Sequence, residues 1–227
     1  MINKYSVLII EDHPLITEAY KSAFEIFQNS REDIEFEIDT ASDCDIAKLK
    51  IEKYASMRSS LDLCLLDIKL PPSHSDEAFR SGEELGVLLR KKIPESKIII
   101  CTLFDNGYRI HNLVKSINPD GFLVKSDITS DELTMAIETV LDKPPYYSKT
   151  VVDVMRKQLT TNFGLDEIDR KILYELSIGT KTKDLPRIVD LSMGGVEKRK
   201  RQLKAVFNVN KQGDRSLILS AKKNGFL

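Results

Sequence analysis

The sequence predicts two domains, an α/β domain with a doubly wound parallel sheet followed by a smaller all-helical domain. Three observations lead to this prediction. Short apolar runs alternate with amphipathic stretches up to residue 142, which is the pattern of a parallel sheet covered by helices. The segment Asp142-Lys-Pro-Pro-Tyr-Tyr-Ser-Lys149 interrupts this alternation, and beyond it the apolar residues have helical spacing only. We therefore expect domains at 1–142 and 162–227, joined by a linker at 143–161.

Five strands are expected in the first domain, each a short apolar run. They are Tyr5–Ile10, Phe36–Thr40, Leu61–Leu66, Lys97–Thr102 and Gly121–Val124. Helices are expected at His13–Gln28, Asp43–Ala55 with Ser42 as its cap, Gly82–Lys92, Tyr108–Ile117 and Ser130–Leu141. Sheets of this kind bind ligands beyond the carboxyl ends of their strands, so we expect the functional residues at that edge.

The net charge of −1 conceals an asymmetry along the chain. Residues 160–227 contain 14 lysines and arginines against 8 aspartates and glutamates, a balance of +6. The rest of the chain has a balance of −7. This distribution indicates that only the C-terminal part meets a polyanion, although two solvated faces would give the same counts.

The three cysteines, Cys44, Cys64 and Cys101, lie far apart in or near apolar stretches. We expect buried thiols there, rather than a disulfide framework or a zinc site. No apolar run approaches the about 20 residues that a membrane helix needs. The N-terminus has no secretory signal pattern. The sequence therefore predicts a cytoplasmic protein without a membrane partner.

Polar residues stand at the carboxyl ends of four predicted strands. They are Glu11 and Asp12, Asp67, Thr102, and Lys125. Converging carboxylates repel each other unless a cation lies between them, and oxygen ligands favour Mg²⁺. A carboxylate beside Mg²⁺ and a lysine can attack a phosphoryl group, which the threonine hydroxyl can then bind. Each residue taken alone could be a turn or solvated residue, so the prediction depends on their joint placement.

The motifs that carry these residues resemble the receiver domain of two-component response regulators, a flavodoxin-like fold, over about residues 4–142. They are Ile9-Ile-Glu-Asp-His-Pro14, Leu65-Leu-Asp-Ile-Lys-Leu-Pro71, Cys101-Thr102 and Gly121-Phe-Leu-Val-Lys125. The resemblance implies that Asp67 accepts phosphate from a sensor histidine kinase. It also implies that Glu11, Asp12, Asp67 and the Lys69 carbonyl bind Mg²⁺. Thr102 and Lys125 would contact the phosphoryl group, and Thr102 and Phe122 would act as the switch.

One departure from the family borders this predicted site. The stretch 72–81 is longer than the usual turn after the phosphoacceptor, and it contains His74, which we expect to be a solvated loop residue. Such an insertion could alter access of Mg²⁺ or the lifetime of the phosphoryl group.

The second domain is predicted to contain a helix-turn-helix. Helices are expected at Leu165–Ser177, at Thr182–Val189 with Thr182 as its cap, from the cap Ser192 to about Phe207, and at Ser216–Lys223. The third carries a basic stripe that we expect to face DNA: Lys198, Arg199, Lys200, Arg201 and Lys204. A charge run of this kind could also be only a solvated face.

This domain is similar to the LuxR/NarL-type DNA-binding domain over about residues 162–227. The shared outline comprises Leu165-Asp-Glu-Ile-Asp-Arg-Lys-Ile-Leu173, Gly179, Lys183-Asp-Leu185, Ser192, Val196, Leu203 and Gly225-Phe-Leu227. Four residues depart from it: Pro186, Gly194, Gly195 and Glu197. Glu197 stands where the family often has a basic residue that meets DNA.

The leading prediction is a response regulator in which phosphorylation of Asp67 controls DNA binding and transcription, with a homodimer as the binding form. It would catalyse its own phosphorylation and have no separate turnover activity. In the first alternative, the C-terminal domain binds protein partners instead of DNA. In the second, the chain is a Mg²⁺-dependent phosphohydrolase. Such enzymes place a second aspartate two residues after the first, and Lys69 at that position argues against this reading.

Overall fold

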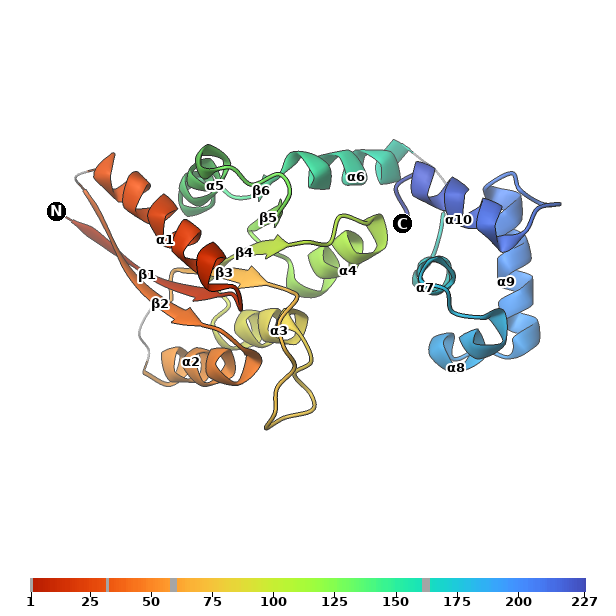
Figure 1. Cartoon of the computed structure of the whole chain (residues 1–227), viewed down its shortest axis with the longest axis horizontal. Coiled ribbons are helices and arrows are strands. Elements are labelled where there is room, and N and C mark those ends of the chain that lie inside the picture. Colours follow the sequence, from red (N-terminus) through yellow and green to blue (C-terminus); the bar gives the residue numbers. More distant parts are fainter. Residues whose placement is uncertain (1, 32, 58–60, 161–163) are drawn as a thin grey trace. The chain divides into compact units, whose positions relative to one another are not determined.

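A computed structural model describes residues 2–31, 33–57, 61–160 and 164–227, and the chain divides into two compact units (Figure 1). The first unit comprises Met1–Phe104 and Leu113–Val151, and the second comprises Asp105–Asn112 and Val152–Leu227. The boundary after Val151 falls inside helix α6 (Lys149–Thr160), within the predicted linker. The predicted junction at 161–163 lies outside the described residues.

The first unit contains a parallel sheet of six strands in the order β2-β1-β3-β4-β5-β6. The strands are β1 (Asn3–Ile10), β2 (Ile34–Ala41), β3 (Leu63–Asp67), β4 (Lys97–Thr102), β5 (Gly121–Val124) and β6 (Tyr146–Tyr147). The order reverses between β1 and β3, and ligands bind at such a point. The four strands with polar ends, β1, β3, β4 and β5, are direct neighbours in the sheet.

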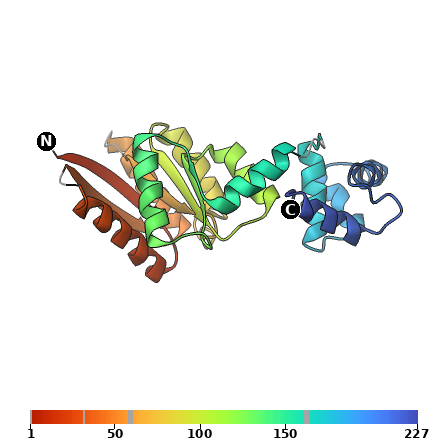
Figure 2. The ribbon, with the colours of Figure 1, turned by 90° about the horizontal axis from the view of Figure 1, so that it is seen from above.

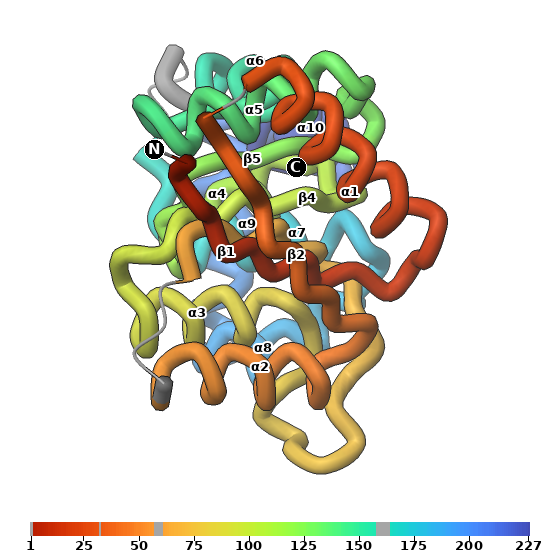
Figure 3. Tube along the Cα trace, turned by 90° about the vertical axis from the view of Figure 1, so that its left-hand side faces the viewer, coloured from red at the N-terminus to blue at the C-terminus, as the bar shows by residue number. Residues whose placement is uncertain are grey.

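Helices cover both faces of this sheet. Helices α1 (Pro14–Asn29) and α5 (Ser130–Asp142) contact each other on one face, and α2 (Cys44–Met57) and α3 (Gly82–Lys92) lie on the other (Figures 2 and 3). The core beneath α1 and α5 joins Phe24, Phe27 and Ile137 to alternate strand residues such as Val7 and Leu65. Alternation follows from the period of two along a strand, and it leaves both faces of the central strands buried.

The predicted doubly wound α/β fold is therefore confirmed, with two local corrections. The sheet has six strands where five were predicted. The sixth, β6, lies within the predicted linker, and two tyrosines after tandem prolines show no alternation that could reveal a strand. Ser42 does not cap α2, because the Asp43 side chain accepts from the Ile46 backbone at 2.8 Å instead. The three cysteines are free and buried, as predicted.

The described part of the second unit is helical. It includes the start of the helix at Gly107–Ile117 and most of α6. Its further helices are α7 (Glu167–Ser177), the short 3₁₀ turn η1 (Thr182–Asp184), α8 (Leu185–Val189), α9 (Met193–Val206) and α10 (Asp214–Lys223). Helices α8 and α9 form the helix-turn-helix, joined at Asp190 in the left-handed conformation with φ of 52°. The Ser192 hydroxyl caps α9 by accepting from the Gly195 backbone, as predicted. Pro186 lies in the first turn of α8, where its missing N–H costs no hydrogen bond.

Thr182 does not act as the predicted cap. Lys181 precedes η1, and the Thr182 hydroxyl accepts from the ammonium group of Lys200 at 2.7 Å. The core of this unit packs Leu173, Leu185, Val196, Leu203 and Phe226 together. No helix in the described ranges has the length and apolar content required to span a bilayer.

One arginine joins the loops at the amino-terminal edge of the sheet. The Arg90 guanidinium donates to four backbone carbonyls, those of Pro94, Ser96, Ile117 and Asn118. It also donates to the Asp120 carboxylate at 2.9 Å, which in turn accepts from the Ile98 backbone. This side chain therefore holds the end of α4 (Gly107–Ile117) beside the start of β4.

We expect Arg90→Ala to lower the free energy of unfolding of the first unit by about 3 kcal/mol, because it leaves a carboxylate and several carbonyls without their donor. Arg90→Lys should recover part of this loss, since an ammonium reaches fewer acceptors than a guanidinium does. Urea unfolding measures both variants. Arg80→Ala is the control, because Arg80 is exposed and, among the residues that the structure describes, donates to the nearby Glu77 carbonyl alone. An equal loss in both alanine variants would contradict the role of Arg90.

Candidate phosphoacceptor site and DNA-facing helix

A buried lysine lies at the centre of the polar cluster at the carboxyl edge of the sheet. Its ammonium group donates to Asp67 Oδ2 at 2.6 Å and to Glu11 Oε2 at 2.7 Å. The exposed fractions of the three side chains are 8% for Lys125, 2% for Asp67 and 0% for Glu11. The structure thus brings together three of the predicted site residues, which come from three different strand ends.

Burial and hydrogen bonding oppose each other in this cluster. Burial raises the pKa of Glu11, and the bonds from Lys125 offset only part of this rise. Burial works against the charge of Lys125, but its hydrogen bonds to Asp67 and Glu11 outweigh that effect and raise its pKa. Two carboxylates share one ammonium, so the cluster is negative when all three groups are ionised.

Asp12 joins the cluster through a histidine that the sequence did not indicate. The Nδ1 atom of His13 lies 2.6 Å from Asp12 Oδ1 and 3.2 Å from Glu11 Oε1. The ligand atoms of Glu11, Asp12 and His13 all lie within 4.8 Å of one another. A cavity of about 220 Å³ borders Glu11 and Asp12 on the side of α1 and β2. This acidic pair and its neighbour form a group of donors suited to a cation.

The other predicted residues lie around Asp67. Lys69 donates its backbone N–H to Asp67 Oδ1 at 3.0 Å. Thr102 is fully buried, and its hydroxyl accepts from the Phe104 backbone at 3.2 Å. Phe122 is fully buried in β5, between Ile100 and Tyr147 in register. The structure therefore places Thr102 at the predicted edge and Phe122 within the sheet.

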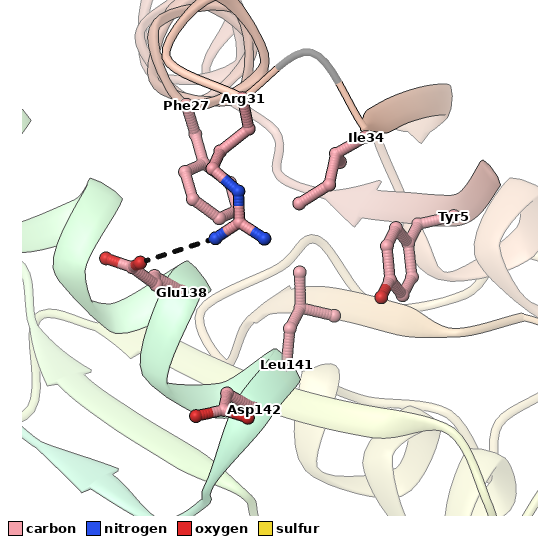
Figure 4. A pocket seen from close by; sticks show the side chains of 7 residues that line it. All are labelled: Tyr5, Phe27, Arg31, Ile34, Glu138, Leu141 and Asp142. Atoms are coloured by element: carbon pink, nitrogen blue, oxygen red, sulfur yellow. Dashed lines mark ion pairs between the residues drawn. The ribbon is translucent and has the colours of Figure 1, made fainter. Parts of the chain in front are cut away.

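A second cavity, of about 300 Å³, lies at the opposite edge of the sheet (Figure 4). Tyr5 and Ile34, from the starts of β1 and β2, line it together with Arg31, whose guanidinium is 3.9 Å from Glu138. Because it adjoins the amino ends of the strands, this cavity is separate from the polar cluster.

In the second unit, three of the five basic side chains predicted to face DNA are paired within the unit. Arg199 donates to Asp166 and, at 3.0 Å, to Asp169. Lys204 lies 3.0 Å from Asp214. Lys200 is only 6% exposed, and its ammonium donates to Thr182 and to Asp214 at 2.8 Å. The prediction for Lys200 therefore needs correction, because this side chain belongs to the interior.

The exposed face of α9 is consequently smaller than the basic stripe in the sequence. Lys198 and Arg201 are exposed there, and Glu197 is 51% exposed beside them. A Cβ atom added to Gly194 would meet no atom within 4 Å, so packing in this structure does not require glycine at that position. We call Gly194, Glu197, Lys198 and Arg201 the open face of α9.

Comparison with known proteins gives a consistent result, although no protein-family model matches the chain. It is 24% identical over 204 residues to the transcriptional regulatory protein MctR of Rhizobium johnstonii, covering 88% of this chain and 86% of that protein. It is 23% identical over 220 residues to the oxygen regulatory protein NreC of Staphylococcus epidermidis, covering 89% and 91%.

Solved structures of RcsB show the same fold. RcsB of Salmonella enterica serovar Typhimurium, bound to a promoter, has a TM-score of 0.63 at 14% identity and covers 97% of this chain and 98% of RcsB. The complex of the two-component response regulator RcsB with DNA has a TM-score of 0.62 at 15% identity, with 96% and 98% covered. The chain has the fold of a response regulator. Its first unit contains the receiver sheet, and its second contains the helix-turn-helix.

The insertion at 72–81, which follows Asp67, is tied to α2. The Asp45 carboxylate accepts from the hydroxyls of Ser73 and Ser75 and from the His74 backbone at 2.9 Å. These bonds hold the pKa of Asp45 well below its usual range. Lys48 pairs with Asp76 at 2.8 Å. The middle of the insertion is therefore attached to α2 through Asp45 and Lys48.

The end of the insertion packs closely against the backbone of Asp67 at Gly82. The sequence did not lead us to expect a role for this glycine. Gly82 donates its N–H to the Ile68 carbonyl at 3.0 Å. A Cβ atom added to Gly82 would lie 1.9 Å from the Asp67 carbonyl oxygen. Only glycine fits here without movement of α3 or of the Asp67 backbone. The feature of the sequence that could have pointed to Gly82 is that a glycine stands at the first position of a predicted helix.

We expect Gly82→Ala to destabilise the receiver unit by about 2 kcal/mol, because overpacking forces the backbone of α3 or β3 to shift. Calorimetric unfolding measures this loss. Gly194→Ala provides the contrast, since its Cβ atom meets nothing and alanine favours a helix. It should leave the stability of the second unit unchanged or slightly higher. An unperturbed receiver in Gly82→Ala would show that the close approach at Asp67 can relax without cost.

Proposed function

We propose that this chain is a two-component response regulator in which phosphorylation of Asp67 by a sensor histidine kinase controls DNA binding by the second unit. The observation that carries the proposal is the ammonium group of Lys125, which bonds Asp67 and Glu11 at the carboxyl ends of neighbouring strands. Similarity to regulatory proteins over most of the chain supports it. The boundaries 1–142, 143–161 and 162–227 remain our proposal for receiver, linker and DNA-binding domain.

In the proposed reaction, a carboxylate oxygen of Asp67 attacks the phosphorus atom of a phosphohistidine. The new O–P bond forms as the P–N bond breaks, and the leaving imidazole retains the electron pair and takes up a proton. Lys125 is held where its ammonium can bind an oxygen of the transferring group. The chain would catalyse this single transfer to itself and would have no further turnover activity.

The donor set fits Mg²⁺. Asp12, Asp67 and Glu11 supply carboxylate oxygens to a cluster that one ammonium leaves negative, and the Lys69 carbonyl would complete the protein ligands. When bound, the ion would offset negative charge on the transferring oxygens. We further propose that the Thr102 hydroxyl binds the acquired phosphoryl group and that Phe122 repacks with it.

Asp67→Asn should abolish labelling of the chain by radioactive acetyl phosphate, because the amide is not a nucleophile for phosphorus. Asp131→Asn is the matched control, since Asp131 is exposed in the first turn of α5 and should label normally. Removal of Mg²⁺ with a chelator should suppress labelling of the unsubstituted chain. Persistent labelling of Asp67→Asn would refute the assignment of the phosphoacceptor.

We propose that the second unit binds double-stranded DNA through the open face of α9. Lys198 and Arg201 offer the exposed cations, and Gly194 leaves room for a close approach of the helix. Glu197 on this face can accept from a cytosine amino group, or it can lower affinity by repelling phosphates. RcsB dimers bind DNA in a solved structure, and we propose a homodimer as the binding form here too. The three buried free thiols suit a reducing cytoplasm.

Arg201→Ala should weaken binding of duplex DNA about fivefold or more, since a lost contact to a base or a phosphate is worth ~1–3 kcal/mol. If that contact is to phosphate, the slope of log affinity against log salt should fall by about one. Lys223→Ala is the control, because it removes an exposed cation from the last turn of α10. Mobility shifts over a salt series measure both. No shift by the unsubstituted chain at low salt would favour a protein partner over DNA.

A further inference from the structure

The loop that follows Lys125 holds the first turn of α6. The Asp127 carboxylate accepts from the Ser148 hydroxyl at 2.7 Å, and from both the backbone N–H and the hydroxyl of Thr150 at 2.9 Å. Burial opposes ionisation of Asp127, but these bonds outweigh it and lower its pKa. Asp127 is therefore a charged acceptor, and hydrogen bonds to a charged group are the strong ones.

Ser148 is bonded to the chain on both sides of Lys125. Its fully buried hydroxyl accepts from the Val124 backbone at 3.2 Å and donates to Asp127. Its backbone N–H donates to the Phe122 carbonyl at 2.9 Å, as an extension of the pairing between β5 and β6. The backbone N–H of Lys125 itself donates to the Thr102 carbonyl at 2.7 Å. Val124 and Asp127, on either side of Lys125, are thus both hydrogen-bonded to the side chain of Ser148, the residue directly before α6.

We propose that Ser148 and Asp127 are positioning residues for Lys125, and that their bonds link the state of Asp67 to the first turn of α6. The Lys125 ammonium reaches both Asp67 and Glu11 only while its backbone stays in place. A phosphoryl group on Asp67 adds charge beside that ammonium and draws it into new bonds. The resulting shift of the Lys125 backbone then displaces Val124 and Asp127, which are hydrogen-bonded to Ser148 and Thr150. This inference rests on the proposed phosphorylation of Asp67.

A simple helix cap would not behave in this way. If Asp127 only capped α6, its loss would lower stability to the same extent with or without a phosphoryl group on Asp67. It would also leave the rate of phosphorylation unchanged. Thr129 provides the matched comparison, because it lies in the same loop and caps α5 by accepting from the Glu132 backbone at 3.1 Å, with no bond to α6 among its described contacts.

The test compares full-length Ser148→Ala, Asp127→Asn and Thr129→Ala with the unsubstituted chain. The first readout is the rate of labelling by acetyl phosphate, which should fall about tenfold or more in the first two variants, because small displacements of a catalytic group cost that much. The second is deuterium exchange of the backbone at 148–155, with and without saturating beryllofluoride and Mg²⁺. Addition of beryllofluoride and Mg²⁺ should change the exchange at 148–155 in the unsubstituted chain and in Thr129→Ala. It should leave the exchange unchanged in Ser148→Ala and Asp127→Asn.

Labelling of Ser148→Ala and Asp127→Asn at the rate of Thr129→Ala would overturn the inference while leaving the proposed function intact. So would exchange at 148–155 that ignores beryllofluoride in the unsubstituted chain. Failure of the unsubstituted chain to label at all would overturn the proposed function and this inference together. Should Ser148→Ala fail to fold, Asp127→Asn decides, because it retains Ser148 and its bond to Val124.

Discussion

The sharing of one buried ammonium between two buried carboxylates organises the first unit. Lys125 can reach Asp67 and Glu11 only if β1, β3 and β5 end at the same level, and the parallel register of the sheet ensures this. The three groups compensate one another because isolated buried charges are costly. The compensation is incomplete, however, and the residual negative charge distinguishes this cluster from an ordinary structural ion pair.

The second unit also contains a buried lysine, but the groups around it leave no uncompensated negative charge. Lys200 donates to Thr182 and Asp214, and Lys204 also pairs with Asp214, so no negative charge is left over. This cluster stabilises the helix-turn-helix and has no evident need for a further ion. The two lysines show that burial of a cation does not by itself indicate function. The balance of charge around the cation is what distinguishes the two clusters.

Much of this arrangement could be predicted from the sequence, because strand periodicity locates strand ends and parallel strands end together. That reasoning placed Glu11, Asp67, Thr102 and Lys125 at one edge. The burial of Lys200 was also readable, since it stands four residues after Val196 and three before Leu203 on the apolar side of α9. The stripe of positive charge obscured this spacing.

Other features depend on contacts between residues far apart in the chain, which periodicity does not record. Arg199 meets Asp166 and Asp169 from 30 or more positions away. Ser148 meets Asp127 across 21 positions. The strand β6 is too short for any repeat to appear. Gly82 could be recognised as a helix start, but its approach to the Asp67 carbonyl depends on how α3 packs.

The hydrogen bond from Gly82 to Ile68 closes the loop of the insertion, so the geometry of Asp67 does not depend on how long that loop is. The chain leaves β3 at Ile68 and returns to the carbonyl of the same residue through the Gly82 N–H, so both ends of the intervening loop meet at one point. Residues added between these ends lengthen a closed loop, at an entropy cost that grows slowly with length. Residues 73–76 also bond Asp45 and Lys48 of α2, so additions there would break those contacts as well. The exposed pair Glu77 and Ala78, which has no part in the bonds to Asp45 and Lys48, is therefore the place where this loop can accept a peptide tag or a fluorescent label without displacing Asp67.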